Sequence, residues 1–228
     1  MIFTDRIHAG RELAAALADY SIREEVLNDR VVVLALPRGG VPVAAEIADK
    51  LALPLDLLLV RKLGVPGHEE YAMGAIASGG LTYLNQDVIN TVRVSQAQID
   101  SVIEREQTEL ARRDRVYRQG QPPLELEGRI VILVDDGLAT GATMQVAVSA
   151  LRSAGVAQIA AAVPVGAPDS CEALRAQVDE LVCLHEPEGF GGVGRWYRNF
   201  DQVTDAQVID LLNQHRGGLH EQGTESYH

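Results

Sequence analysis

The chain has 228 residues, a length typical of one large domain. Its composition, 46% hydrophobic and 23% charged, is close to the globular average and excludes a disordered or collagen-like chain. With 20 basic and 32 acidic side chains, the formal net charge is −12. Because such a chain repels a phosphate backbone, nucleic-acid binding is disfavoured, and an anionic ligand would need a local positive site.

The sequence predicts a cytoplasmic protein without a membrane segment. Its N-terminus lacks the basic and apolar regions of a signal peptide, and no apolar run approaches the ~18 residues that span a bilayer. Cys171 and Cys183 are too few for a disulfide framework, and their spacing matches no zinc pattern. We therefore expect both to be reduced core residues.

Short apolar runs predict buried strands. Four of them span residues 31–36, 55–60, 129–134 and 158–165, and a weaker fifth spans 180–184. Helical patterns lie between them over 41–52, 143–155 and 169–178. This alternation predicts βαβ units and a mainly parallel sheet covered on both faces. An opening helix is expected over 6–20, and a disordered tail over 216–228.

A long polar segment, residues 95–119, predicts a surface helix that lies across the sheet. Ser95 and Gln98 form a candidate capping box at its start. Its narrow apolar stripe comprises Ile99, Val102, Ile103, Glu106 and Leu110. Charged runs such as 104–106 and 111–115 are usually a solvated face, and we expect no functional role for their charges.

The most informative segment is RIVILVDDGLATGATM, residues 129–144. An apolar strand leads into Asp135 and Asp136, at the edge of a parallel sheet where ligands bind. Two carboxylates there could accept hydrogen bonds from a diol or face a divalent cation. The T-G-A-T turn that follows offers hydroxyls and helix N-terminal amides to a phosphate, so the pair predicts a ribose 5-phosphate site. The alternative is that the acids only cap the helix.

A second segment, ALPRGGVPVA at residues 35–44, predicts an anion-binding loop. Gly39 and Gly40 let the backbone approach an anion closely, a helix N-terminus follows, and Arg38 adds positive charge. The alternative is a plain glycine turn.

The segment from 57 to 80 places Arg61 and Lys62 at the end of a strand, before a loop and a small hairpin that turns at Gly79 and Gly80. On the loop, Glu69, Glu70 and Tyr71 could take part in proton transfer, although glutamates on such loops are more often solvated. Beyond the last strand, aromatic residues gather between 185 and 200, and they could stack on a base or form a small satellite core or a dimer contact.

The frame from Ile132 to Met144 resembles the phosphoribosyl-pyrophosphate (PRPP) binding motif of the type I phosphoribosyltransferases. The span from about Phe3 to Gln207 is also similar to a subgroup that carries ALPRGGVPVA and VRKLG. The resemblance implies an α/β domain over 1–215, with a central, mainly parallel sheet flanked by helices, a hairpin lid near 61–84 and a hood near 185–203.

The resemblance also implies roles for individual residues. The acids Asp135 and Asp136 would hold the ribose hydroxyls and face Mg²⁺, directly or through water. The loop that follows would hold the 5′-phosphate; it comprises Gly137, Leu138, Ala139, Thr140, Gly141, Ala142 and Thr143. The pyrophosphate loop would comprise Pro37, Arg38, Gly39 and Gly40. The catalytic set would be Arg38, Arg61, Lys62, Asp135 and Asp136, with Lys62 the weaker candidate. Candidates for base binding are Phe190, Trp196 and Tyr197.

The implied reaction is Mg²⁺-dependent displacement of pyrophosphate from PRPP by a nitrogen base, in a homodimer such as family members usually form. Ala139 stands where 6-oxopurine members carry an acid, and the hood lacks their lysine, which argues against hypoxanthine or guanine. Two alternatives are a non-catalytic PRPP or nucleotide sensor and a phosphoacceptor domain. The second would need an acid at the end of a different strand.

Overall fold

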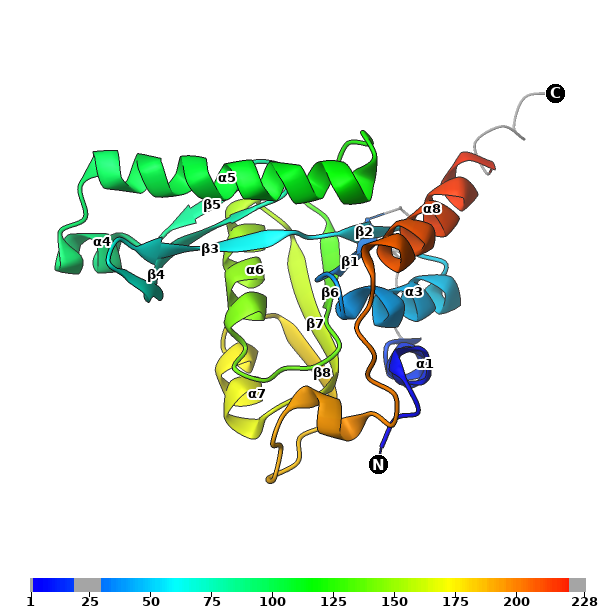
Figure 1. The fold of residues 1–228 in the computed structure, drawn as a ribbon. Coiled ribbons are helices and arrows are strands. Elements are labelled where there is room, and N and C mark those ends of the chain that lie inside the picture. Colours follow the sequence, from blue (N-terminus) through cyan, green and yellow to red (C-terminus); the bar gives the residue numbers. More distant parts are fainter. Residues whose placement is uncertain (1, 19–29, 222–228) are drawn as a thin grey trace.

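Five apolar segments form the central parallel sheet of the computed structural model, which describes residues 2–18 and 30–221 (Figure 1). Its strands are β1 (Val31–Ala35), β2 (Leu55–Leu57), β6 (Ile130–Val134), β7 (Gln158–Val165) and β8 (Glu180–His185). Their order is β2-β1-β6-β7-β8, and all neighbours are parallel. The predicted fold class is therefore confirmed.

Both faces of the sheet are buried, which explains why its strands are continuous apolar runs. Alternate residues of β1 point to opposite faces, so that Val33 packs in one core and Val32 in the other. Helices α1 (Arg6–Ala16), α3 (Gly40–Leu51) and α8 (Asp205–Glu221) cover the first core. Helices α6 (Ala142–Ser153) and α7 (Pro168–Arg175) cover the second.

A second, antiparallel sheet lies between β2 and β6 in the chain. It consists of β3 (Val60–Val65), β4 (His68–Ala77) and β5 (Leu81–Leu84), and Figure 1 shows it extending away from the parallel sheet. The turn between β4 and β5 contains Gly79 and Gly80, both with positive φ, as predicted. It occupies the segment over which the hairpin lid is expected, and we refer to it as the lid.

The single strand predicted over 55–60 is wrong. The Leu58 amide still bonds Ala35 O, but the Leu59 carbonyl accepts from Ser78 N near the end of β4. The chain thus leaves the parallel sheet between β2 and β3. As a result, the basic pair and the glutamates predicted near a loop lie within lid strands: Arg61 and Lys62 in β3, Glu69 and Glu70 in β4.

The long helix α5 (Gln96–Arg118), which follows α4 (Gln86–Val92), begins at the predicted capping box of Ser95 and Gln98. It packs on β3, β4 and α8 rather than across the parallel sheet. Its charges do not all face solvent, because Glu106 is buried against Arg61. At its end the buried Arg118 donates to Asp56 Oδ2 at 2.6 Å and fastens α5 to β2.

The chain ends differ from the sequence prediction. Helix α1 ends at Ala16, and part of the helix expected over 6–20 lies outside the described residues. Helix α8 continues to Glu221, so the boundary expected at residue 216 falls inside it, and residues 222–228 lie outside the description.

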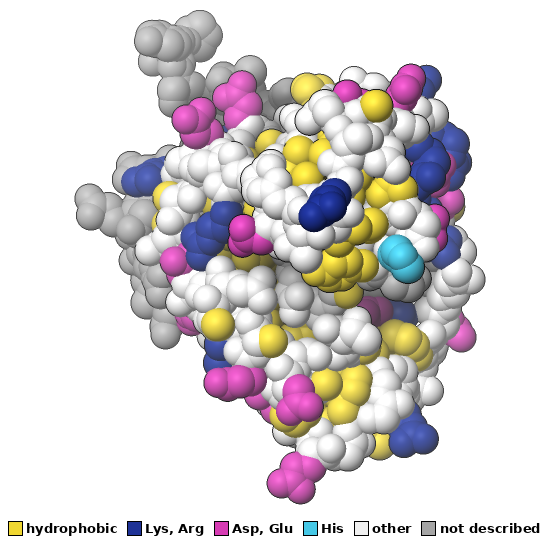
Figure 2. Space-filling view, turned by 90° about the vertical axis from the view of Figure 1, so that its left-hand side faces the viewer, with side chains coloured by type: hydrophobic (Ala, Val, Ile, Leu, Met, Phe, Trp, Pro, Cys, Tyr) yellow, Lys and Arg dark blue, Asp and Glu magenta, His cyan; other side chains and the backbone are white. Residues whose placement is uncertain are grey.

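On the face shown in Figure 2, acidic, basic and apolar side chains are interspersed. Among the described helices, none has the length and apolar character needed to cross a membrane.

Candidate active site

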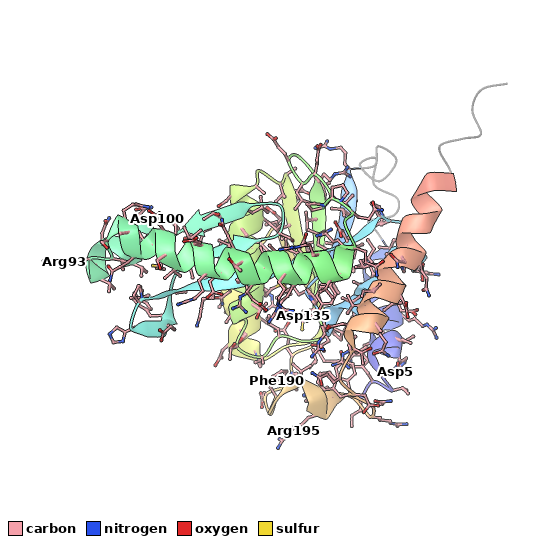
Figure 3. All side chains as sticks on the ribbon, turned by 45° about the horizontal axis from the view of Figure 1, so that its top comes forward. Asp5, Arg93, Asp100, Asp135, Phe190 and Arg195 are labelled. Atoms are coloured by element: carbon pink, nitrogen blue, oxygen red, sulfur yellow. The ribbon has the colours of Figure 1, made fainter. Side chains whose placement is uncertain are left out.

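The predicted ligand-binding segments meet at the point where the strand order of the sheet reverses. The chain passes from β1 to β2 on one side and from β6 to β7 on the other. In open α/β sheets, ligands bind outside the carboxyl ends of the two strands at such a point. Residues 37–40 follow β1 and residues 135–143 follow β6, so the fold brings together two segments about a hundred residues apart. Figure 3 shows Asp135 near the centre of the molecule.

Glycines allow these two segments to touch. A Cβ atom at Gly39 would lie 2.5 Å from Asp136 Cγ, and one at Gly40 would lie 2.6 Å from Val134 O. Gly39 has a φ of −61°, which any residue can adopt, so it is needed for close approach and not for a turn. The peptide bond between Pro37 and Arg38 is cis.

The two adjacent acids are half-buried and influence each other's charge. Asp135 Oδ1 accepts from the Asp136 amide at 2.8 Å. Burial, and the charge of Asp136 beside it, raise the pKa of Asp135 well above its ordinary value. Burial also raises the pKa of Asp136, although Arg6 opposes this shift. A cation or hydroxyl donors would stabilise both carboxylates in their charged form.

Arg6, which the sequence analysis missed, is the ion-pair partner of Asp136. Its Nε and Nη2 atoms both lie 2.8 Å from Asp136 Oδ2, and Nη1 donates to Asp201 O at 2.8 Å. The guanidinium carbon lies 3.9 Å from the centre of the Phe200 ring. No local pattern could have shown this pair, because 130 residues separate its members.

The loop from Gly137 to Thr143 forms one wall of a cavity of about 200 Å³. Leu138 is buried and its amide bonds Val165 O, whereas Ala139 and Thr140 are exposed. Gly141 has a φ of 73° and caps α6. The amides in the first turn of α6 have no intrahelical acceptors, so the cavity suits a phosphate group.

A second cavity, of about 320 Å³, lies beside the first, and Thr143 lines both. Its charged lining consists of Arg38, Arg61, Arg112, Arg113 and Asp205. All four arginines face carboxylates: Arg61 Nε lies 2.8 Å from Glu106, Arg38 lies 3.6 Å from Asp205, and Glu109 binds the other two. Arg38 and Arg61 are predicted site residues, whereas Arg112 and Arg113 of α5 are lining residues that no sequence motif indicated. Lys62 is not among the lining residues.

Comparison with known proteins agrees with this geometry. Residues 4–195 match the family model described as "Phosphoribosyl transferase domain". The chain belongs to the phosphoribosyltransferase family. It is 45% identical over 213 residues to proteins named "Putative phosphoribosyl transferase" from two strains of Mycobacterium tuberculosis, CDC 1551 / Oshkosh and H37Rv. The match covers 93% of this chain but 47% of each relative, so the chain spans about half their length.

A solved structure is also similar. The crystal structure of TT1426 from Thermus thermophilus has a TM-score of 0.84 and 41% sequence identity, covering 94% of this chain and 99% of that one. The region of the phosphoribosyltransferase match includes both segments of the candidate site, whereas α8 lies beyond it.

The segment expected to form the hood, residues 185–203, contains a satellite core. Tyr197 is buried with its ring 5.5 Å from Phe3, and its hydroxyl donates to Asp136 O at 2.6 Å. The ring packs within this core while its hydroxyl holds the Asp136 backbone, and base stacking by Tyr197 stays a prediction. Phe190 and Trp196 are only partly buried, joined by a bond from Trp196 Nε1 to Phe190 O, and base stacking by these two residues stays a prediction.

In the lid, Glu69 and Tyr71 are exposed and line neither of the two cavities at the site. Glu69 lines a different hollow of about 340 Å³ between the turn after β3 and the start of α5. A role in proton transfer for the lid glutamates thus stays a prediction.

Proposed function

We propose that the protein binds PRPP and transfers its ribose 5-phosphate to a nitrogen base, releasing pyrophosphate. The observation that carries this proposal is the pair of adjoining cavities on either side of Thr143. One is walled by amides that suit a phosphate, and the other by four guanidinium groups. The two acids at the start of the β6 loop complete the set of groups that a phosphorylated sugar with a second anionic end requires.

Each part of the ligand has a candidate partner. The α6 amides and the hydroxyls of Thr140 and Thr143 would hold the 5′-phosphate, and the two acids would accept hydrogen bonds from the ribose hydroxyls. Arg38 and Arg61 would hold the pyrophosphate after exchanging Asp205 and Glu106 for its oxygens.

The chemistry is a substitution at C1 of the ribose. The bond from C1 to the pyrophosphate oxygen breaks and its electron pair leaves with that oxygen. The nitrogen of the base supplies the pair for the new bond and releases its proton to solvent. Positive charge develops on the ribose ring, and the nearby carboxylates stabilise it. The protein would contribute by holding the two reactants in line and by stabilising the charge of the leaving group.

The donor set at the end of β6 fits Mg²⁺, since this ion prefers carboxylate oxygens and binds through one or two of them together with substrate phosphates. Asp135 and Asp136 would hold it, directly or through water. The ion would supply positive charge to the pyrophosphate as it leaves.

The absence of a carboxylate at residue 139 favours one class of acceptor base over another. Ala139 offers no carboxylate to a base, and an adenine-type or orotate-type acceptor is therefore favoured over hypoxanthine or guanine. Phe190 and Trp196 are the candidates to stack on it. A homodimer in the cytoplasm remains our expectation.

Calorimetric titration of PRPP with Mg²⁺ tests this function. We expect binding by the wild type, loss of binding in an Asp135→Asn/Asp136→Asn double variant, and normal binding in Asp87→Asn, an exposed control on α4. A screen for pyrophosphate release over purine and pyrimidine bases then tests turnover. Binding without release on any base would instead establish a PRPP sensor, and no binding by the wild type would refute both functions.

A further inference from the structure

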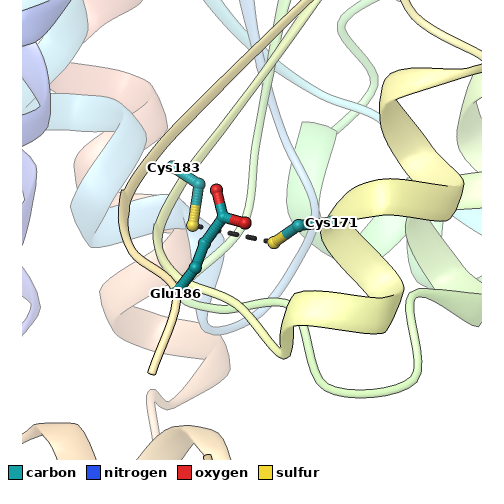
Figure 4. Close-up of side chains that lie close together, drawn as sticks. All are labelled: Cys171, Cys183 and Glu186. Carbon is teal, nitrogen blue, oxygen red and sulfur yellow. Dashed lines mark hydrogen bonds between the residues drawn. The ribbon is translucent and has the colours of Figure 1, made fainter. Parts of the chain in front are cut away.

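A cluster of three metal-ligating side chains lies outside the candidate active site. Cys171 on α7 and Cys183 on β8 bring their sulfur atoms to 3.8 Å, and Glu186 follows the end of β8 (Figure 4). One ligand atom from each residue lies within 4.8 Å of the other two. The two thiols do not form a disulfide. The fold thus joins side chains whose spacing in the sequence matches no metal motif.

The distance between the sulfurs fits one particular coordination geometry. A tetrahedral zinc ion binds each thiolate at about 2.3 Å, which places two sulfurs about 3.8 Å apart. The two thiols therefore need no rearrangement to share such an ion. The carboxylate of Glu186 is close enough to become the third ligand, and a water molecule would complete the tetrahedron.

The surroundings leave room for this arrangement. Gly166 lies against both cysteines: a Cβ atom there would overlap Cys171 Sγ and would lie 3.3 Å from Cys183 Sγ. Cys171 is buried, whereas Cys183 and Glu186 are half-buried, so the cluster is reachable from the surface on one side.

The charges also balance. A divalent ion with two thiolates and one carboxylate carries a net charge of −1. Arg175, on the same helix as Cys171, donates a hydrogen bond to Glu186 Oε1. It would neutralise the complex and hold the carboxylate in place, as residues behind metal ligands commonly do.

We propose that Cys171, Cys183 and Glu186 form a binding site for Zn²⁺. Both thiols release their protons to solvent as the metal–sulfur bonds form, and no oxidation or reduction is involved. Soft thiolate ligands select zinc over magnesium, so this site would not compete for the ion proposed at the active site.

The site would also brace the phosphate-binding loop. Leu138 forms a bridge with Gly166, which lies against both sulfurs, and Ser170, the neighbour of Cys171, donates to Ala139 O at 2.6 Å. A metal ion held by Cys171 and Cys183 would fix α7, whose Ser170 holds this loop, against β8. The proposal does not depend on the transferase function, because the three ligands lie outside both active-site cavities.

Cadmium titration of the full chain, stripped of metal with a chelator, tests the site. We expect one Cd²⁺ per chain with an ultraviolet thiolate-to-metal charge-transfer band, and displacement of Cd²⁺ by Zn²⁺. The variants Cys171→Ser, Cys183→Ser and Glu186→Gln should each lose tight binding, and Arg175→Gln should weaken it by about 10–100-fold. The matched control is Glu188→Gln, an exposed carboxylate two residues from the proposed ligand.

Thermal unfolding in chelator checks that each variant is folded, and added Zn²⁺ should raise the melting temperature of the wild type but not of Cys183→Ser. The absence of a charge-transfer band in the wild type would overturn the proposal, as would equal affinity in either cysteine variant. If Glu186→Gln binds Cd²⁺ with the affinity of the wild type, Glu186 is not a ligand and the three-ligand site is overturned.

Discussion

Replacing Gly39 by alanine tests whether contact between the β1 and β6 loops sets the geometry of the site. The new Cβ atom would lie 2.5 Å from Asp136 Cγ, whereas ordinary contact begins at 3.4 Å, so the carboxylate must shift by about 1 Å. That shift would break the 2.8 Å hydrogen bond from Arg6 Nε. A displacement of this size at a reacting centre costs about 10²-fold in rate, and we expect a comparable loss of PRPP affinity.

Overpacking should also lower the free energy of unfolding, by about 1–3 kcal/mol. Titration calorimetry and urea denaturation would measure the two effects separately. Gly189→Ala is the control, since a Cβ atom there meets nothing within 4 Å. A folded Gly39→Ala variant that keeps wild-type stability and PRPP affinity would refute the role given to this contact.

Three more predictions follow from buried charges. Arg118→Met leaves Asp56 buried without its ion-pair partner, and urea denaturation should show a loss of about 3–5 kcal/mol that a further Asp56→Leu change largely restores. Arg6→Gln removes the ion pair with Asp136 and should lower the free energy of unfolding by about 1.5–3 kcal/mol and weaken PRPP binding, and Arg6→Lys should recover part of both losses. Equal PRPP affinities of the wild type and Arg6→Gln in calorimetry would contradict this prediction. Folding raises the pKa of Asp135, so the folded chain binds a proton at this carboxylate more readily than the unfolded chain does. As the pH falls toward about 3.9, the pKa of an Asp in the unfolded chain, the free energy of unfolding of the wild type should therefore rise relative to that of Asp135→Asn. A stability difference that does not change with pH would contradict the last prediction.

Features encoded locally were predictable from the sequence. The strands of the central sheet are short apolar runs because both of their faces are covered, and the start of α5 follows from Ser95 and Gln98 alone. Gly39 and Asp136 meet because parallel strands place their carboxyl ends at one edge of the sheet.

Features that depend on how distant segments pack were missed. The run 55–60 reads as one strand, and only the pairing of Leu59 with Ser78 in the lid divides it. The buried Glu106 has the sequence context of a solvated helix, and its burial depends on the lid lying over α5. The ring contact between Tyr197 and Phe3 joins the hood to the N-terminal segment, and no local pattern in the sequence indicates it.

The N-terminal segment and the hood complete the site together, which has a consequence for synthesis of the protein. Phe3 N bonds Trp196 O, and Arg6 binds both Asp136 and Asp201, which lie 130 and 195 residues away from it in the chain. Closing so long a loop has a large entropic cost, and ribosomes release the N-terminal part first. The full set of contacts that holds Arg6 against Asp136 therefore forms only after residues 196–201 have been synthesised.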